Sequence, residues 1–227
     1  MSKPEKKTRI VDSQAVASNL KKTDTLSKNG KPFKINGVDC FWELKLPLRE
    51  GSNDGDGILT LRNIQSKKAL LINSDYYSLD NSYYTNSFNG VDFESFNKDC
   101  IKDVNFDGYK DFMIYGLEES GSAGSLYKVY LFNDKKKLFE QSKALSGYDI
   151  LLDTVNKTRT SGGRNGYNYN VSVTDFFGRR GTIKYTETTE REVISDEPKR
   201  LLKTTYNKIV NKKVVQTIID TTNFEGW

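Results

Sequence analysis

The sequence of 227 residues contains no histidine and only two cysteines. Without histidine, the chain cannot supply the imidazole base of a Ser-His-Asp triad or a histidine ligand for a metal. Two cysteines are too few for a Cys₄ zinc site. No apolar run approaches the roughly 18 residues of a membrane-spanning helix. These absences exclude many enzyme classes and predict no spanning helix.

Carboxylate pairs are the enzymatic option that remains. By residue type alone, the candidates for a glycosidase pair are Glu118, Glu119, Glu187, Glu190 and Glu192. The last three lie in a threonine-rich stretch, and this pattern predicts an edge strand guarded by charge. No nucleophile stands in a recognisable elbow motif. We therefore expect a protein that is not an enzyme.

Positive charge is concentrated near the N-terminus. Of 35 basic and 30 acidic residues, nine and three fall within residues 1–34, which leaves 26 and 27 elsewhere. The nearly neutral body contains no nucleic-acid-binding motif, so we expect no nucleic-acid partner. Residues 1–31 are polar and predict a disordered basic tail. They contain no apolar signal-peptide core, which leaves a cytoplasmic protein or an exported domain without its signal.

Residues 32–227 predict a single all-β domain. Short segments rich in Tyr, Thr, Val and Ile alternate with turn residues, and no 12-residue helical period stands out. Val129 and Leu131 on one face, with Tyr130 and Phe132 on the other, predict a strand covered on both sides. The expected strands span residues 40–48, 58–61, 69–72, 112–115, 127–132, 167–177, 182–189, 201–210 and 214–219.

Cys40 and Cys100 each begin an apolar segment. In an exported domain they could form one disulfide. Two buried free thiols are the alternative, and the spacing does not decide between them.

One nine-residue segment has the pattern of a calcium loop. Oxygen-bearing side chains occupy its positions 1, 3, 5 and 9, and they are Asp103, Asn105, Asp107 and Asp111. Gly108 at position 6 permits a sharp reversal, and Tyr109 at position 7 offers its backbone carbonyl. Hard oxygen ligands in this number favour Ca²⁺ over Mg²⁺. Position 12 is Ile114 rather than glutamate, so the loop is not an EF-hand.

Two segments rich in glycine and serine are candidate partner-binding loops. They span residues 116–125 and 161–169, and the second contains arginine and tyrosine, which are enriched at interface hot spots. Together with the calcium loop nearby, they predict one binding edge. The candidate partner-binding residues are Ser120, Gly121, Ser122, Ser161, Gly162, Arg164 and Tyr167.

The order of these motifs over residues 99–170 resembles one bacterial family. The matching segments are 103–111, 112–115, the first glycine/serine loop, 127–132, 136–139, 145–147 and 157–169. The chain resembles the calcium-binding lysozyme-inhibitor and immunity lipoproteins of Gram-negative bacteria, and it is similar to periplasmic inhibitors of invertebrate-type lysozyme. In such inhibitors a Ser-Gly loop with a nearby tyrosine enters the hydrolase cleft.

The resemblance implies a propeller-like antiparallel β domain in the periplasm or at the outer membrane, with a possible lipid anchor in the precursor. It further implies that the protein blocks a lysozyme-like peptidoglycan hydrolase or toxin. The inserted residues would be Ser120 and Gly121, with Tyr127 downstream, or the candidates in the second loop. A calcium-dependent adhesion or glycan-binding module of the cell envelope is the alternative, and it predicts an exposed aromatic platform near the metal.

Overall fold

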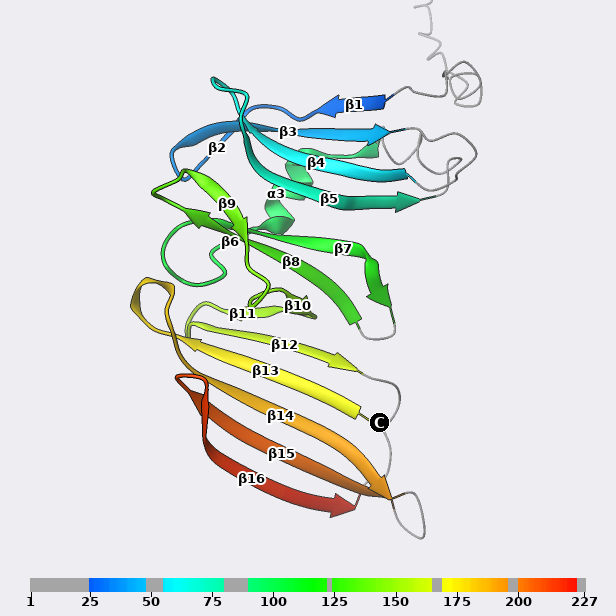
Figure 1. The fold of residues 1–227 in the computed structure, drawn as a ribbon, viewed down its shortest axis with the longest axis vertical. Coiled ribbons are helices and arrows are strands. Elements are labelled where there is room, and N and C mark those ends of the chain that lie inside the picture. Colours follow the sequence, from blue (N-terminus) through cyan, green and yellow to red (C-terminus); the bar gives the residue numbers. More distant parts are fainter. Residues whose placement is uncertain are drawn as a thin grey trace, which may run out of the picture.

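The computed structural model describes residues 25–47, 55–79, 90–121, 124–164, 169–195 and 200–223. These residues form three antiparallel sheets, one α-helix and one 3₁₀ turn. The all-β prediction is confirmed. In Figure 1 the sheets follow one another along the long axis of the molecule. The propeller-like arrangement implied by the resemblance stays a prediction.

The first sheet has the order β1–β3–β4–β5, with β2 paired to β3. Its strands are β1 (Thr25–Asn29), β2 (Phe33–Ile35), β3 (Val38–Pro47), β4 (Gly55–Asn63) and β5 (Ala69–Leu79). The predicted boundary of the tail at residue 31 is wrong, because Thr25–Asn29 pairs with β3 over its whole length. Leu26 packs against the core. The backbone ladder, the apolar contact of Leu26 and a hydrogen bond from Lys28 Nζ to Val91 O at 2.8 Å hold this mostly polar segment in place.

A short helix, α3 (Phe93–Cys100), follows the first sheet, where the sequence analysis expects no helix. It begins at the N-cap Asp92, whose carboxylate accepts a hydrogen bond from Glu94 N at 2.9 Å. Its eight residues are too few to show a clear period, and burial of Phe93 and Cys100 holds it against the core. None of the helices in the described residues is long and apolar enough to cross a membrane.

The second sheet has the order β10–β8–β7–β6, with β9 paired to β8. Its strands are β6 (Ile101–Lys102), β7 (Asp111–Gly121), β8 (Gly124–Asn133), β9 (Leu138–Gln141) and β10 (Gly147–Tyr148). Two hydrophobic clusters meet at β8. Tyr130 and Phe132 join Trp42 and Phe112 in the first cluster, whereas Val129 lies in the second. The prediction that this strand is covered on both sides is confirmed.

The third sheet contains its strands in chain order. They are β11 (Leu151–Asp153), β12 (Thr158–Arg164), β13 (Tyr169–Phe177), β14 (Ile183–Ser195), β15 (Leu201–Val210) and β16 (Lys213–Asn223), with the 3₁₀ turn η1 (Arg179–Gly181) after β13. None of the described residues of β14, β15 or β16 is buried. Beyond β13 the sheet is therefore a single layer with solvent on both faces.

One type of hairpin turn is used three times, once in each sheet. The turns start at Asn63, Asn133 and Asp153, and the side-chain oxygen of each accepts backbone hydrogen bonds from the turn that it starts. Each ends on a lysine with left-handed backbone, and these are Lys67, Lys137 and Lys157.

Candidate functional site

The predicted calcium loop closes on its own backbone. The carboxylate of Asp103 accepts hydrogen bonds from Asp107 N and Gly108 N, both at 3.1 Å. Asn105 Oδ1 accepts from Asp107 N at 3.2 Å, and Asp107 Oδ1 accepts from Tyr109 N at 2.8 Å. The loop therefore turns the oxygens of three side chains toward its interior.

Left-handed backbone at Gly108 (φ +98°) makes this reversal possible. Phe106 is also left-handed (φ +59°), although it is not a glycine, and its side chain is buried. Its ring lies 5.4 Å from that of Phe177, centroid to centroid. Burial of an aromatic ring offsets the strain of the backbone at this position.

Asp111 has a second role that the spacing did not indicate. Its side chain is fully buried, and its two oxygens accept backbone hydrogen bonds from Val104 at 3.0 Å and Phe132 at 2.9 Å. Burial raises the pKa of Asp111 to about 7, against these two hydrogen bonds and with the help of the charges of Asp107 and Asp103. Asp111 thus ties the loop to β8, and its part as a metal ligand stays a prediction.

The donor set fits a hard cation. Among the described residues, no three Asp, Glu, Cys or His side chains form a group that could hold a metal. A site here would combine two carboxylates, those of Asp103 and Asp107, with the amide oxygen of Asn105 and the backbone carbonyl of Tyr109. Such all-oxygen sets suit Ca²⁺, and a cation would relieve the repulsion between the two carboxylates.

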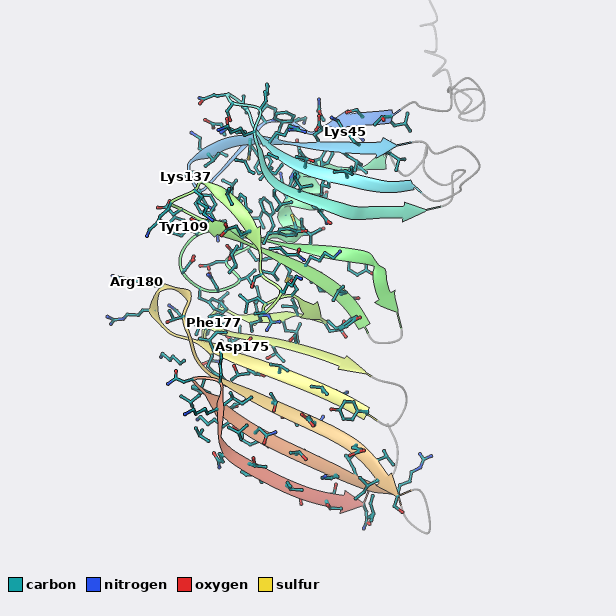
Figure 2. The ribbon with its side chains drawn as sticks, viewed as in Figure 1. Lys45, Tyr109, Lys137, Asp175, Phe177 and Arg180 are labelled. Carbon is teal, nitrogen blue, oxygen red and sulfur yellow. The ribbon has the colours of Figure 1, made fainter. Side chains whose placement is uncertain are left out.

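Tyr109 is the exposed aromatic residue of this loop, with 38% of its surface accessible. Its ring packs against Phe132 with centroids 5.4 Å apart. In Figure 2, Tyr109 lies on the same side of the molecule as Lys137 and Arg180. A single half-packed ring provides less than the aromatic platform expected for the glycan-binding alternative.

The glycine/serine segments are strands over most of their length, where the sequence analysis expects loops. Ser120 and Gly121 end β7, and Ser161, Gly162 and the backbone of Arg164 belong to β12. Ser161 pairs with Val173 and Gly162 with Ser172. Cross-strand pairing overrides the turn preference of glycine and serine here. Ser122 and Tyr167 lie outside the described residues.

The two segments nevertheless share one edge of the molecule. The ends of β7 and β12 and the beginnings of β8 and β13 lie together on the right of Figure 1. β10 connects them, since it pairs with β8 and its Gly147 faces Ser161. A Cβ at residue 147 would lie only 3.3 Å from Ser161 Cβ. Nearby, Asp149 Oδ1 accepts a hydrogen bond from Ser125 N at 2.9 Å.

The calcium loop is not close to this edge. It ends where β7 begins, at Asp111, whereas the first glycine/serine segment is the far end of the same eleven-residue strand. The expectation that the metal loop borders the binding edge is therefore wrong. Sequence distance suggested proximity, but the strand β7 runs between the two segments, and a strand rises about 3.3 Å per residue.

A buried ion pair joins the beginning of β12 to the end of β13, at the other end of these strands from the edge (Figure 2). Arg159 Nη1 donates to Asp175 Oδ2 at 2.6 Å, and Nη2 donates to Ser161 Oγ at 3.1 Å. Thr186 donates to the second oxygen of Asp175 at 2.7 Å. Burial lowers the pKa of Arg159, and the charge of Asp175 opposes this. No local pattern in the sequence predicts this pair, because residues 16 apart meet only when β12 and β13 are aligned.

Both cysteines are free and buried. This agrees with the second of the two alternatives left open by the sequence.

Comparisons with protein-family models, with curated proteins and with solved structures found no match.

Proposed function

We propose that this protein is a calcium-stabilised inhibitor or immunity protein that binds a lysozyme-like peptidoglycan hydrolase. The observation that supports this is the shared edge, since the glycine/serine ends of β7–β8 and β12–β13 lie on the same side of the molecule in Figure 1. Small side chains allow close approach of a backbone to a narrow cleft. The motif order of residues 99–170, which resembles the inhibitor family, supplies the class of partner.

The packing around Ser161 and at the start of β8 suits a rigid insert. Ser161 is held by Arg159 from one side and by Gly147 from the other, and Asp149 fixes the start of β8. Preorganised segments lose little conformational entropy on binding. In this proposal the calcium loop stabilises the opposite end of β7 and makes no contact with the hydrolase. The protein acts by occlusion rather than by catalysis, and it works in the periplasm or at the outer membrane.

The proposal is tested by inhibition of peptidoglycan lysis. Purified protein is titrated against hydrolases of several classes, including an invertebrate-type lysozyme, and the turbidity of a cell-wall suspension is followed. Inhibition of one class, together with a stoichiometric complex by gel filtration, supports the proposal. Replacement of Ser120 by arginine, or of Arg164 by alanine, should weaken binding by about 2 kcal/mol or more if these are hot spots. The matched surface control is Lys135→Ala, which lies outside the edge.

Two results would overturn the proposal. One is unchanged lysis by every hydrolase at a large excess of protein. The other is calcium-dependent binding to a glycan array without binding to any hydrolase, which would favour the glycan-binding alternative. A role for the exposed ring of Tyr109 would then be tested with Tyr109→Ala.

A further inference from the structure

A basic cleft lies beside the calcium loop, on the side of the molecule away from the proposed binding edge. Its volume is about 880 Å³, within the size range of small-molecule sites. Five separate segments line it: β6, the calcium loop, β7, β11 with the residues on either side of it, and η1. Five cationic side chains contribute to the lining, and they are Lys102, Lys110, Lys157, Arg179 and Arg180.

These cations are not neutralised by the described residues. None of the five forms an ion pair with them, and the Lys102 ammonium donates one hydrogen bond, to Lys98 O at 3.1 Å. The two acids of the cleft are Asp103 and Asp107. Both carboxylates accept hydrogen bonds from their own loop instead. Five positive charges against two negative ones leave the cleft with an excess of positive charge.

The turn that carries the two arginines is fixed in place. Phe177, just before it, packs on Phe106, and Gly178 N donates to Thr182 O at 2.7 Å. Thr182 Oγ1 donates to Arg179 O at 3.1 Å. The backbone that carries both arginines is therefore held in place, and the exposed Arg180 side chain extends outward from it in Figure 2.

Arg180 has left-handed backbone, with φ +60°. Glycine or asparagine adopts this conformation more readily than arginine does. The left-handed Lys157 is explained by its place at the end of one of the three similar hairpin turns. Arg180 lies in η1 and belongs to none of these turns. A long cationic side chain at a position that favours glycine points to a use for the guanidinium group.

Apolar side chains complete the lining of the cleft, among them Phe106, Met113, Ile150 and Leu152. We infer that the cleft binds a small phosphate ester, with the phosphate held by its cationic side chains and the apolar part of the molecule against these residues. Guanidinium groups engage phosphate oxygens in pairs, and a phosphate carries close to two charges at neutral pH. This inference goes beyond the inhibitor function and does not depend on it.

Hexyl phosphate is the probe. It is titrated into the full chain in low salt with EGTA, and binding is measured from ¹H–¹⁵N NMR spectra. We expect saturable shifts at residues 101–110, 150–157 and 177–182, and tighter binding than that of inorganic phosphate by threefold or more. Hexanol should not bind. Shifts spread over residues without regard to the cleft, or equal affinity for chloride and phosphate, would overturn the inference.

The decisive variant is Arg179→Gln with Arg180→Gly, which removes both guanidinium groups and places glycine at the left-handed position. Affinity for hexyl phosphate should fall at least tenfold, while the melting temperature stays unchanged or rises. The matched control, Lys135→Gln with Lys143→Gln, removes the same charge from exposed sites outside the cleft and should change affinity less than twofold. An equal loss in both variants would show that only net charge matters.

The source of the phosphate is distinguished by vesicles. If phosphatidylglycerol vesicles bind the protein, hexyl phosphate should compete with them, because both present the same group to the cleft. Vesicle binding that hexyl phosphate does not displace, or that the control variant loses equally, would contradict a site in this cleft.

Discussion

The side-chain amide of Asn36 forms two hydrogen bonds with the backbone of Lys110. Lys110 N donates to Asn36 Oδ1 at 2.8 Å, and Asn36 Nδ2 donates to Lys110 O at 2.7 Å. These residues are 74 positions apart, and Lys110 is the last residue of the calcium loop before β7. The turn between β2 and β3 therefore fixes the end of the loop.

Replacement of Asn36 by glycine should lower the free energy of unfolding by about 1 kcal/mol, the scale of one or two exposed hydrogen bonds. Glycine preserves the left-handed backbone at this position (φ +48°) and removes only the amide. Urea denaturation gives the measurement. Asn36→Asp keeps the hydrogen-bond acceptor, so its free energy of unfolding should lie between those of the wild type and Asn36→Gly. The control is Asn211→Gly, another left-handed asparagine, with no described side-chain hydrogen bond. A similar loss in both variants would contradict the role of the amide.

Removal of calcium should destabilise the protein. A cation that binds the native loop alone adds about 2.7 kcal/mol at a hundredfold excess over Kd, which corresponds to roughly 5–10 °C in melting temperature for a chain of this size. EGTA should remove this increment from the wild type but not from Asp107→Ala. Asp220→Ala, an exposed aspartate outside the loop, should keep the full response. An unchanged melting curve with EGTA, in protein shown to be loaded with metal, would refute the calcium proposal.

Without calcium, stability should fall as the pH rises from 5 to 8. The pKa of Asp111 is raised to about 7 in the folded protein by burial, whereas an exposed aspartate has a pKa near 3.8. The folded state therefore holds a proton that the unfolded state has lost, and this stabilisation disappears as the pH passes through about 7. The slope is at most about 1.4 kcal/mol per pH unit. The chain has no histidine to titrate in this range.

Asp111→Asn is the matched variant for the pH experiment. It removes the titrating group, so its free energy of unfolding should be flat between pH 5 and pH 8, although lower overall because an amide can accept backbone hydrogen bonds through one atom only. Urea midpoints at five pH values provide the comparison. Parallel pH profiles for wild type and variant would assign the dependence to other groups.

The sequence predicted the strands better than it predicted the helix, which depends on contacts between distant residues. Leu201–Val210 forms a strand with the predicted bounds, because Tyr, Thr and Val fit a pleated surface whatever lies beside it. Helix α3 was missed because its existence depends on burial of Phe93 and on the hydrogen bond from Trp42 Nε1 to Asn97 Oδ1. Such contacts join residues 55 positions apart and leave no local pattern.

In the candidate site, too, the sequence predicted the local features but not the contacts between distant segments. The oxygens of Asp103, Asn105 and Asp107 turn inward as their spacing indicates, since a tight loop makes alternate residues converge. The backbone partners of Asp111, the Arg159–Asp175 pair and the basic cleft arise only when distant segments are brought together. Spacing along the chain contains no information about these contacts.

Both thiols should resist modification in the native protein. Burial raises the pKa of Cys40 to about 12 and raises that of Cys100 as well, so that almost no thiolate forms at pH 8. Ellman's reagent should react with both thiols in guanidinium chloride and at least a hundredfold more slowly in buffer. Two rapid equivalents of reaction in buffer would show that the cysteines are exposed. Such protection would keep the thiols reduced in an oxidising compartment.

Gly181 provides the strictest test of how the third sheet supports the calcium loop. Its backbone is left-handed (φ +71°), and a Cβ there would lie 2.7 Å from Asn105 Nδ2 and 3.0 Å from Asp107 Cβ. The amide can rotate away, but Asp107 Cβ can move only if the loop backbone moves. Gly181→Ala should therefore weaken calcium affinity about tenfold. It should also lower the free energy of unfolding by about 1 kcal/mol, because alanine is strained in the left-handed backbone conformation.

The control for this variant is Gly37→Ala. Gly37 has nearly the same backbone conformation (φ +78°), but nothing lies within 4 Å of an added Cβ. Gly37→Ala should lose the same stability from its left-handed backbone conformation without any change in calcium affinity. The affinity is measured by competition with a fluorescent chelator. If both variants bind calcium as the wild type does, then η1 does not support the loop. If both weaken binding equally, general destabilisation rather than contact with Asn105 and Asp107 is the cause.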